Sequence, residues 1–279
     1  MIEAKQKSFN KMFKIYFDYR MLKILLLGAI SGFPWVLIGS SLSLWLKEDG
    51  LSRSTIGWAG LIFGVYAFNY LWAPLIDRIQ IPLLTKKIGH RRGWIVLMQI
   101  IILLSLIVWS VIDPTENLAL LISVGLIIAI ASATQDITVD ALRIEQINEN
   151  EGKSMAAGAA MAVVGWWTGY KLGGVVALFT AEFFENLGVT DYWQATFLIL
   201  GVLIILMNIG LMFVNEPIET DRQAKQRETD QLIGKKLGSN NLITNFIAYI
   251  TGTIGGPIIS FFKKNGFAIA AGILSLIHI

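Results

Sequence analysis

The sequence contains no cysteine and only two histidines, His90 and His278, among its 279 residues. This lack excludes disulfide bonds, thiolate nucleophiles and cysteine-ligated metals, and two histidines are too few for a histidine-rich metal centre. Charged residues make up only 15% of the chain, whereas 54% of it is hydrophobic and the mean hydropathy is +0.61. A soluble domain of this length could bury a core with far fewer apolar residues. The composition therefore indicates a membrane protein, and we predict neither a metal nor a cofactor.

Long apolar stretches recur along the chain. A helix needs about 20 apolar residues to cross a bilayer, and each of these stretches has roughly that length. We predict six spans: Met21–Leu46, Thr55–Ile76, Trp94–Ile112, Leu118–Ala141, Ser154–Phe179 and Gln194–Val214. Lipid-exposed backbone must satisfy its own hydrogen bonds, so these spans are expected to be helical and the fold class to be an all-α integral membrane bundle over 21–214. The first span is too long for a signal peptide, and no small-residue cleavage site precedes Lys47.

Basic residues gather in alternate gaps between the predicted spans. The segment before the first span and the gaps after the second, fourth and sixth spans hold nearly all of the lysines and arginines, whereas the other gaps hold only Lys47 and Arg53 among several acids. Because basic loops remain in the cytoplasm, residues 1–20 are expected to be cytoplasmic. The net charge of +3 then reflects loops beside anionic lipid, and nucleic acid is not an expected partner.

The composition changes after the sixth span. Residues 215–265 are predicted to form a cytoplasmic linker, in which the glycine-broken stretch Leu242–Phe262 is interpreted as an interfacial amphipathic segment rather than a seventh span. An apolar run, Gly266–Ile279, follows and is too short to cross a bilayer. We interpret it as the truncated start of a seventh helix.

Ionisable residues inside the predicted spans are costly in lipid, so each is a candidate functional residue. Asp136 and Asp140 are four residues apart and share a helix face, which Arg143 can join. They could form an ion-pair clamp at the inner surface, the interpretation favoured for Asp140, or they could bind a proton or a substrate. Lys171, deep in the fifth span, could pair with Asp136, extend to the outer surface or bind an anion, and Trp167 lies one turn before it.

Glycines interrupt two of the spans. In the fifth span they form one stripe, which predicts close packing against a neighbouring helix and directs Lys171 away from that contact: Gly158, Gly165, Gly169 and Gly173. In the first span, Gly28, Gly32, Pro34 and Gly39 predict either an ordinary kink or the kind of broken helix that transporters place near substrate.

Charges also gather in the loop after the second span, where Asp77 and Arg78 precede Arg91 and Arg92. These charges could form a charge-linked gate between two helices, or they could belong to a basic loop that faces lipid. The sequence has no phosphate-binding loop, Ser-His-Asp set, His-Glu-x-x-His motif or dinucleotide fingerprint, which argues against an enzyme.

This loop resembles the one between helices two and three of the major facilitator superfamily, which reads roughly Gly-x-x-x-Asp-Arg-x-Gly-Arg-Arg. Here ten residues, Ile79–Ile88, separate Asp77-Arg78 from Gly89-His90-Arg91-Arg92. This spacing resembles the branch that contains the AmpG-type muropeptide permeases and the acetyl-CoA transporters. That branch also has Ala-Thr-Gln-Asp-x-x-x-Asp-Ala in helix four and Gly-Tyr-(Arg/Lys)-Leu-Gly in helix five, which stand here as Ala133–Ala141 and Gly169–Gly173.

The resemblance implies a proton-driven symporter of the bacterial inner membrane, with two six-helix halves around a central cavity. Such a symporter imports anhydromuropeptides for cell-wall recycling by alternating access. The substrate and proton site would comprise Asp136, Lys171, Gln135, Asp140, Tyr170 and Trp167, and the gate would comprise Asp77, Arg78, Arg91, Arg92 and Arg143. The expected partners are a glycopeptide or another anionic solute, protons, the lipid bilayer and a C-terminal half that this sequence lacks. The alternatives are a transporter of acetyl-CoA or a drug, and a membrane scaffold without transport activity.

Overall fold

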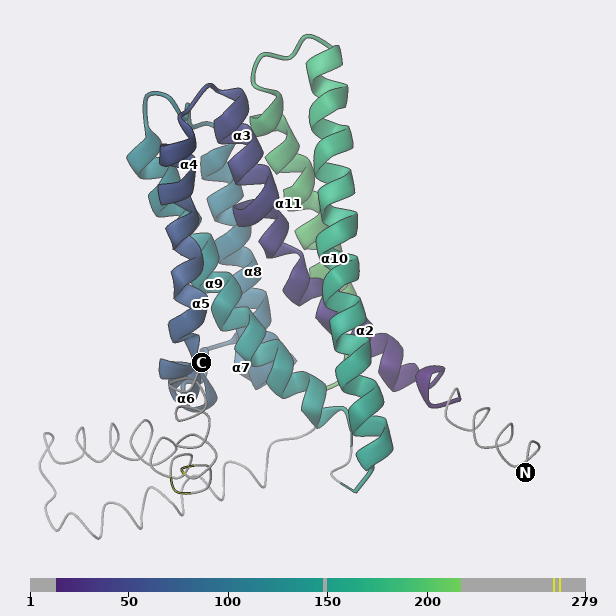
Figure 1. Ribbon diagram of the computed structural model, residues 1–279. Coiled ribbons are helices and arrows are strands. Elements are labelled where there is room, and N and C mark those ends of the chain that lie inside the picture. The colour runs from purple at the N-terminus through teal and green to yellow at the C-terminus, as the bar shows by residue number, and fades with distance from the viewer. Residues whose placement is uncertain (1–13, 148–149, 217–262, 264–265, 267–279) are drawn as a thin grey trace, which may run out of the picture. The chain divides into compact units, whose positions relative to one another are not determined.

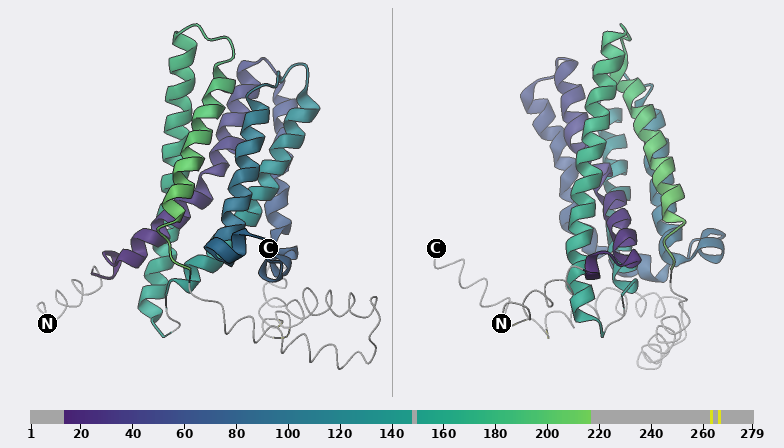
Figure 2. Two further views of the ribbon diagram at one scale, coloured as in Figure 1. Left: turned by 180° about the vertical axis from the view of Figure 1, so that it is seen from behind. Right: turned by 90° about the vertical axis from the view of Figure 1, so that its right-hand side faces the viewer.

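The computed structural model describes residues 14–147, 150–216, 263 and 266. In this part of the chain the regular secondary structure is helical, with no strand. The chain divides into two compact units, of which the first comprises Met1–Tyr70 with Gln80–Pro217 and the second Leu71–Ile79 with Ile218–Ile279. In the first unit, long helices lie side by side in alternating directions (Figures 1 and 2). Most of the second unit, including the predicted linker and seventh helix, lies outside the described residues.

The first unit contains most of the helices. In chain order these are α2 (Tyr19–Gly32), η1 (Val36–Ser41), α3 (Leu42–Glu48), α4 (Arg53–Ala59), η2 (Gly60–Gly64), α5 (Val65–Phe68), α7 (Leu84–Ile88), α8 (His90–Trp109), α9 (Leu118–Glu145), α10 (Gly152–Asn186) and α11 (Tyr192–Leu211). The short helix η3 (Asn69–Leu71) crosses into the second unit, which also contains α6 (Ala73–Arg78).

The glycine stripe of the fifth span packs against α2, as its spacing predicted. A Cβ atom added at Gly165 would overlap the Leu25 carbonyl oxygen, and one at Gly169 would overlap that of Ala29. The contact is mutual, because a Cβ at Gly28 would overlap the carbonyl oxygen of Ala162 on α10. The two backbones therefore touch directly, and this contact fixes α2 against α10 in the middle of the unit (Figure 1).

The first span is interrupted near Pro34, as either of the two forms predicted from its proline and glycines requires, and it divides into α2, η1 and α3. Pro34 has no N–H, so it cannot make the helical hydrogen bond to the carbonyl of Ile30 four residues earlier. The side chain of Gln135 on α9 takes its place and donates from Nε2 to the Ile30 oxygen at 2.8 Å. Beyond the break the chain continues as the π-helix η1, in which the Leu42 N–H bonds to Leu37, five residues back.

The second span differs from the single helix that its hydropathy suggested. Residues Thr55–Ile76 are divided among α4, η2, α5, η3 and α6, with tight 3₁₀ turns at Gly60–Gly64 and Asn69–Leu71. Glycine at 57, 60 and 64 lowers the preference for a regular helix, which hydropathy does not measure. By length and composition, four described helices are apolar enough to cross a membrane: Tyr19–Glu48, His90–Trp109, Leu118–Glu145 and Tyr192–Leu211. The six-span count and the orientation remain predictions.

The first unit has two chemically different ends. At one end, which we call the basic end, α2, α8 and α10 begin and α9 and α11 end. The opposite end, which we call the acidic end, is formed by the loops 49–52, 110–117 and 187–191. Buried tryptophans fill the core toward the acidic end, where Trp45, Trp109 and Trp193 surround Phe197 with ring centroids 5.0 to 6.0 Å from it. The candidate site lies between this core and the basic end.

Candidate functional site

Asp136 lies on α9 at the wall of a cavity of about 400 Å³. Its carboxylate accepts a hydrogen bond of 2.6 Å from the hydroxyl of Ser31 on α2. Nine residues separate it from the end of α9, so it is about 14 Å from the basic end. The cavity is lined by residues of α2, α9 and α10: Gly28, Ser31, Asp136, Val139, Asp140, Arg143, Ala159, Ala162, Val163 and Trp166. An acidic side chain is thus held in the wall of a cavity lined mainly by apolar and small residues.

Asp140 and Arg143 occupy the mouth of this cavity. Their side chains form an ion pair at 3.0 Å, in agreement with their i,i+3 spacing. The Asp140 side chain is 66% exposed, whereas that of Arg143 is 19% exposed and its Nε has no hydrogen-bond partner among the described residues. The pair places one positive and one negative group beside the path from the basic end to Asp136.

Lys171 lines a second, smaller pocket of about 240 Å³, together with Ser40, Ser41 and Tyr170. Its ammonium group lies 5.6 Å from the ring centroid of Trp167 and 5.5 Å from that of Tyr170, in the range of cation–π interactions. The structure therefore brings Lys171 together with Trp167, as their spacing predicted, and also with Tyr170. It does not pair Lys171 with Asp136, because no ion pair joins them among the described residues.

An aromatic wall separates the two hollows. Trp166 lines the Asp136 cavity and Tyr170 lines the Lys171 pocket, and their rings stack with centroids 5.6 Å apart at 16°. Trp35, next to Pro34, adds an edge contact to Trp166 at 5.5 Å and packs on Tyr66 at 4.6 Å. Sequence analysis selected Trp167 and missed Trp166 and Trp35. The signal for Trp166 was its place beside Gly165, on the side of α10 that packs against α2.

Gln135 is fully buried and does not face the cavity lining. Its amide nitrogen bonds to Ile30 as described, and its Oε1 has no partner among the described residues. Within the described residues, its visible contribution is to hold α9 against the broken part of α2, one residue away from Asp136.

At the start of α8, Arg91 and Arg92 are held by acids that sequence analysis missed. The carboxylate of Glu216 accepts hydrogen bonds from both backbone N–H groups, at 2.8 Å from Arg91 and 3.0 Å from Arg92. The buried Arg91 side chain pairs with Glu145 at the end of α9, at 3.4 Å. An anion at a helix N-terminus satisfies free N–H groups and the helix dipole, so this corner ties α8, α9 and the end of α11 together.

The other two predicted gate residues belong to the second unit. Asp77 lies in α6 with an exposed side chain, and Arg78 ends this helix. Their part in a gate remains a prediction.

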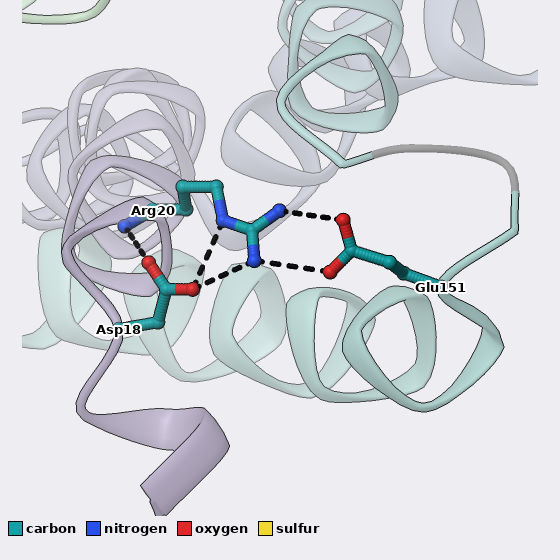
Figure 3. Close-up of polar contacts among 3 residues, drawn as sticks. All are labelled: Asp18, Arg20 and Glu151. Carbon is teal, nitrogen blue, oxygen red and sulfur yellow. Dashed lines mark hydrogen bonds and ion pairs between the residues drawn. The ribbon is translucent and has the colours of Figure 1, made fainter.

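A further charged cluster joins the beginnings of α2 and α10 (Figure 3). The Arg20 guanidinium donates two hydrogen bonds of 3.0 Å to Glu151 and also binds the Asp18 carboxylate at 2.7 Å. Asp18 in turn accepts from the Arg20 backbone N–H and caps α2. The hydrogen bonds from Arg20 keep the pKa of Asp18 below its usual value. The cluster is an ion-paired clamp at the basic end.

Comparison with known proteins agrees with this arrangement. The Major Facilitator Superfamily model matches residues 24–278. The chain is 33% identical over 251 residues to "Putative transporter AmpG 4" of Rickettsia felis, covering 90% of the chain and 54% of that protein. It is 31% identical over 207 residues to "Anhydromuropeptide permease" of Escherichia coli K12, covering 74% of the chain and 40% of that protein. The chain thus spans about half the length of the curated relatives it matches.

The family match covers most of the chain, and it confirms the resemblance drawn from the charged loop after the second span and from the motifs of the fourth and fifth spans. The chain belongs to the Major Facilitator Superfamily.

Proposed function

We propose that this chain forms a six-helix half of a secondary transporter in the bacterial inner membrane, and that the transporter imports anhydromuropeptide together with protons. The observation that carries this proposal is the Ser31-bound Asp136 in the wall of a cavity of about 400 Å³. A carboxyl group is expensive within a membrane and is kept there when it binds a proton, an ion or a substrate. Similarity to a protein named anhydromuropeptide permease supplies the substrate class.

The Lys171 pocket suits the other end of such a substrate. An anhydromuropeptide carries peptide carboxylates and sugar rings, which require a cation and aromatic surfaces respectively. Lys171 provides the cation, and Trp167 and Tyr170 provide the rings beside it. Since the hollows of Asp136 and Lys171 share the wall of Trp166 and Tyr170, a ligand that displaced this wall would contact both charges.

The paired charges at the basic end support a gate. Arg91 is buried and bound to Glu145, and Glu216 occupies the N-terminus of α8. In an alternating-access cycle, such contacts would form in one state and break in the other, with Asp77, Arg78, Arg92 and Arg143 as further members. The Asp140–Arg143 pair at the cavity mouth would control access to Asp136.

Uptake of labelled anhydromuropeptide into cells that produce the full-length transporter, with this chain joined to its second half, tests this proposal. We expect accumulation that a protonophore abolishes, and loss of accumulation in Asp136→Asn and Lys171→Ala. Matched controls are Glu116→Gln and Lys153→Ala, which change exposed residues near the helix ends. Uptake insensitive to the protonophore would remove proton coupling, and uptake unchanged in both site variants would remove the site.

Two other results would redirect the proposal. Uptake of acetyl-CoA or a drug in place of the muropeptide would retain the transport site and change its substrate. Absence of transport of any of these solutes would favour the scaffold alternative.

A further inference from the structure

The break at Pro34 divides the first span into two parts that are held by different neighbours. Before the break, α2 lies directly against the backbone of α10, and a Cβ atom added at Gly32 would overlap the carbonyl oxygen of Trp166. After the break, α3 is fixed in the tryptophan core, where the Trp45 ring centroid lies 5.0 Å from that of Phe197. One span therefore belongs to two packing groups, α2 with α10 and α3 with the core toward the acidic end.

A hollow separates α10 from the part of the span that follows the break. This hollow is the Lys171 pocket of about 240 Å³, which Ser40, Ser41 and Leu44 line from η1 and α3. A Cβ atom added at Gly174, on the α10 side of the pocket, would meet no atom within 4 Å. The pocket therefore leaves room for α10 to move relative to η1 and α3, whereas the direct backbone contact leaves none between α10 and α2.

Two adjacent residues of α9 hold the break. Gln135 donates its 2.8 Å hydrogen bond to the carbonyl oxygen that Pro34 leaves without its helical partner. Asp136 accepts the 2.6 Å bond from Ser31, which precedes the break, and the Trp35 indole, which follows it, interacts with the same carboxyl group. Hydrogen bonds to an ionised group are roughly twice as strong as those between neutral groups, so the hold of Asp136 on the break depends on its charge.

Few other charges share the surroundings of Asp136. Among the described residues, the charged or titratable groups that face it are Asp140 and Arg143 on its own helix and Tyr66 on α5. The residues of α2 and α10 that line its cavity are uncharged. Since Asp140 and Arg143 pair with each other, Asp136 is the acid whose protonation changes the charge beside the break.

We propose that the break at Pro34 is a hinge, which the charged Asp136 carboxylate locks and a protonated Asp136 releases. The inference rests on the proposed proton coupling and assigns Ser31 and Trp35 to it as positioning residues. On release, α2 and α10 move together against η1 and α3, because backbone contacts join α2 to α10 while the aromatic core holds α3. This movement changes the width of the Lys171 pocket, so a proton at Asp136 alters the proposed binding place of the substrate carboxylates.

A row of aromatic rings gives the hinge a second link to Lys171. Trp35 makes its edge contact with Trp166 at 5.5 Å, and Trp166 stacks on Tyr170 at 5.6 Å. The Tyr170 ring lies 5.5 Å from the Lys171 ammonium group. A shift of Trp35 on release of the hinge therefore displaces the wall between the two hollows, which brings the charge of Asp136 and that of Lys171 within reach of one ligand.

Distances between pairs of spin labels test the hinge without any substrate. The measurement uses the full-length transporter in lipid nanodiscs, with any cysteine of its second half replaced, since this chain has none. One pair, Ser43→Cys with Leu172→Cys, reports on α3 against α10. The reference pair, Leu22→Cys with Val164→Cys, reports on α2 against α10, and all four positions are exposed.

In mildly alkaline buffer, we expect Asp136→Asn to shift the first distance by about 2 Å or more, the scale of helix movements in switching proteins, and to leave the reference distance constant. Ser31→Ala should shift the first distance in the same direction, because it removes one contact of Asp136. Asp140→Asn is the control for the loss of an acid from the same cavity. Ser105→Ala is the control for the loss of a buried hydroxyl, since Ser105 bonds to the Ile101 carbonyl of its own helix.

Acidification is the second readout, and a merely structural role of Asp136 would not affect it. The first distance should shift on acidification of the unaltered protein and stay constant in Asp136→Asn. A first distance that changes in neither Asp136→Asn nor Ser31→Ala would overturn the hinge. An equal change in both label pairs, or in the control variants, would also overturn it, because the bundle would then have loosened as a whole.

The uptake assay separates the hinge from the proposed function. Uptake of anhydromuropeptide without the shift in label distance would overturn the hinge and retain the proposed function. The shift without uptake would retain the hinge and overturn the proposed function.

Discussion

The basic and acidic ends of the first unit are held by different interactions. At the basic end, acids and bases pair between helices: Arg20 with Asp18 and Glu151, Arg91 with Glu145, and Glu216 with the start of α8. At the acidic end, Glu48 accepts hydrogen bonds from Tyr192 at 2.9 Å and from Trp193 at 2.5 Å, above the buried tryptophan core. Asp113 and Asp191, two further acids at this end, repel Asp49.

This difference separates a switchable end from a fixed one. Ion pairs between partly exposed side chains, such as Arg20 with Glu151, are worth about 0 to 1 kcal/mol each, so they can be broken and re-formed during a conformational cycle. A core of interlocking aromatic rings provides many contacts that are lost together. We therefore expect the basic end to contain the moving gate and the acidic end to move as a rigid body.

The largest effect on stability is expected at the backbone packing of α2 on α10, because both ends of the unit depend on this contact. Gly165→Ala would push its Cβ into the Leu25 carbonyl and force the helices apart, at a cost of about 1 to 3 kcal/mol. Gly174→Ala, on the same helix, has no atom within 4 Å of the new Cβ and is the matched control. Thermal unfolding in lipid nanodiscs measures the difference. Equal midpoints for the two variants would show that the contact is not close.

A smaller effect is expected at the start of α8. Glu216→Ala removes the acceptor of two backbone N–H groups and the favourable charge at the helix N-terminus, which together stabilise by about 1 to 2 kcal/mol. Glu182→Ala, which changes an exposed acid on α10, is the control. Chemical unfolding in mild detergent monitors both. If Glu216→Ala and the control unfold at the same denaturant concentration, the stability of the basic end does not depend on this cap.

The features that the sequence predicts are those that depend on the spacing of residues within one helix. The Asp140–Arg143 pair, the glycine face of α10 and the contact of Lys171 with Trp167 follow from intervals of three or four residues. The break at Pro34 follows from its missing N–H. Each of these depends on one helix, whose geometry a single sequence determines.

The contacts between helices are different, because they depend on which helices are neighbours and in what register. Glu151 binds Arg20 across 131 positions, Glu216 binds Arg91 across 125 and Gln135 binds Ile30 across 105. Ser31, Tyr66 and Trp166 approach Asp136 from other helices in the same way, and none of them forms a sequence motif with it. Hydropathy likewise predicts that the second span is apolar, although not that its glycines divide it into short helices.

A still smaller effect is expected at the clamp of Figure 3. Arg20 and Glu151 are each about one-third exposed, so the double-mutant cycle of Arg20→Met and Glu151→Gln should give a coupling energy of about 0.5 to 1 kcal/mol that declines with salt. The pKa of Asp18 is lowered by its bonds to Arg20, so its contribution is complete above the unfolded pKa of about 4 and is lost as the pH falls through the lower folded value. A coupling energy of zero at low salt would contradict the clamp.

The smallest effect is expected at the acidic end, and its dependence on pH has the opposite sign. Burial, and then repulsion by Asp113, raises the pKa of Asp49, so the folded protein holds this proton more tightly than the unfolded chain does. Asp49 therefore destabilises the protein as the pH rises above about 4, and acidification removes the penalty. Asp49→Asn should stabilise by a few tenths of a kcal/mol at pH 7 and show no gain at pH 4. Unfolding midpoints measured at pH 7 and at pH 4 test this expectation, with Glu116→Gln as the control. A gain in stability at pH 4 equal to that at pH 7 would assign the effect to packing rather than to charge.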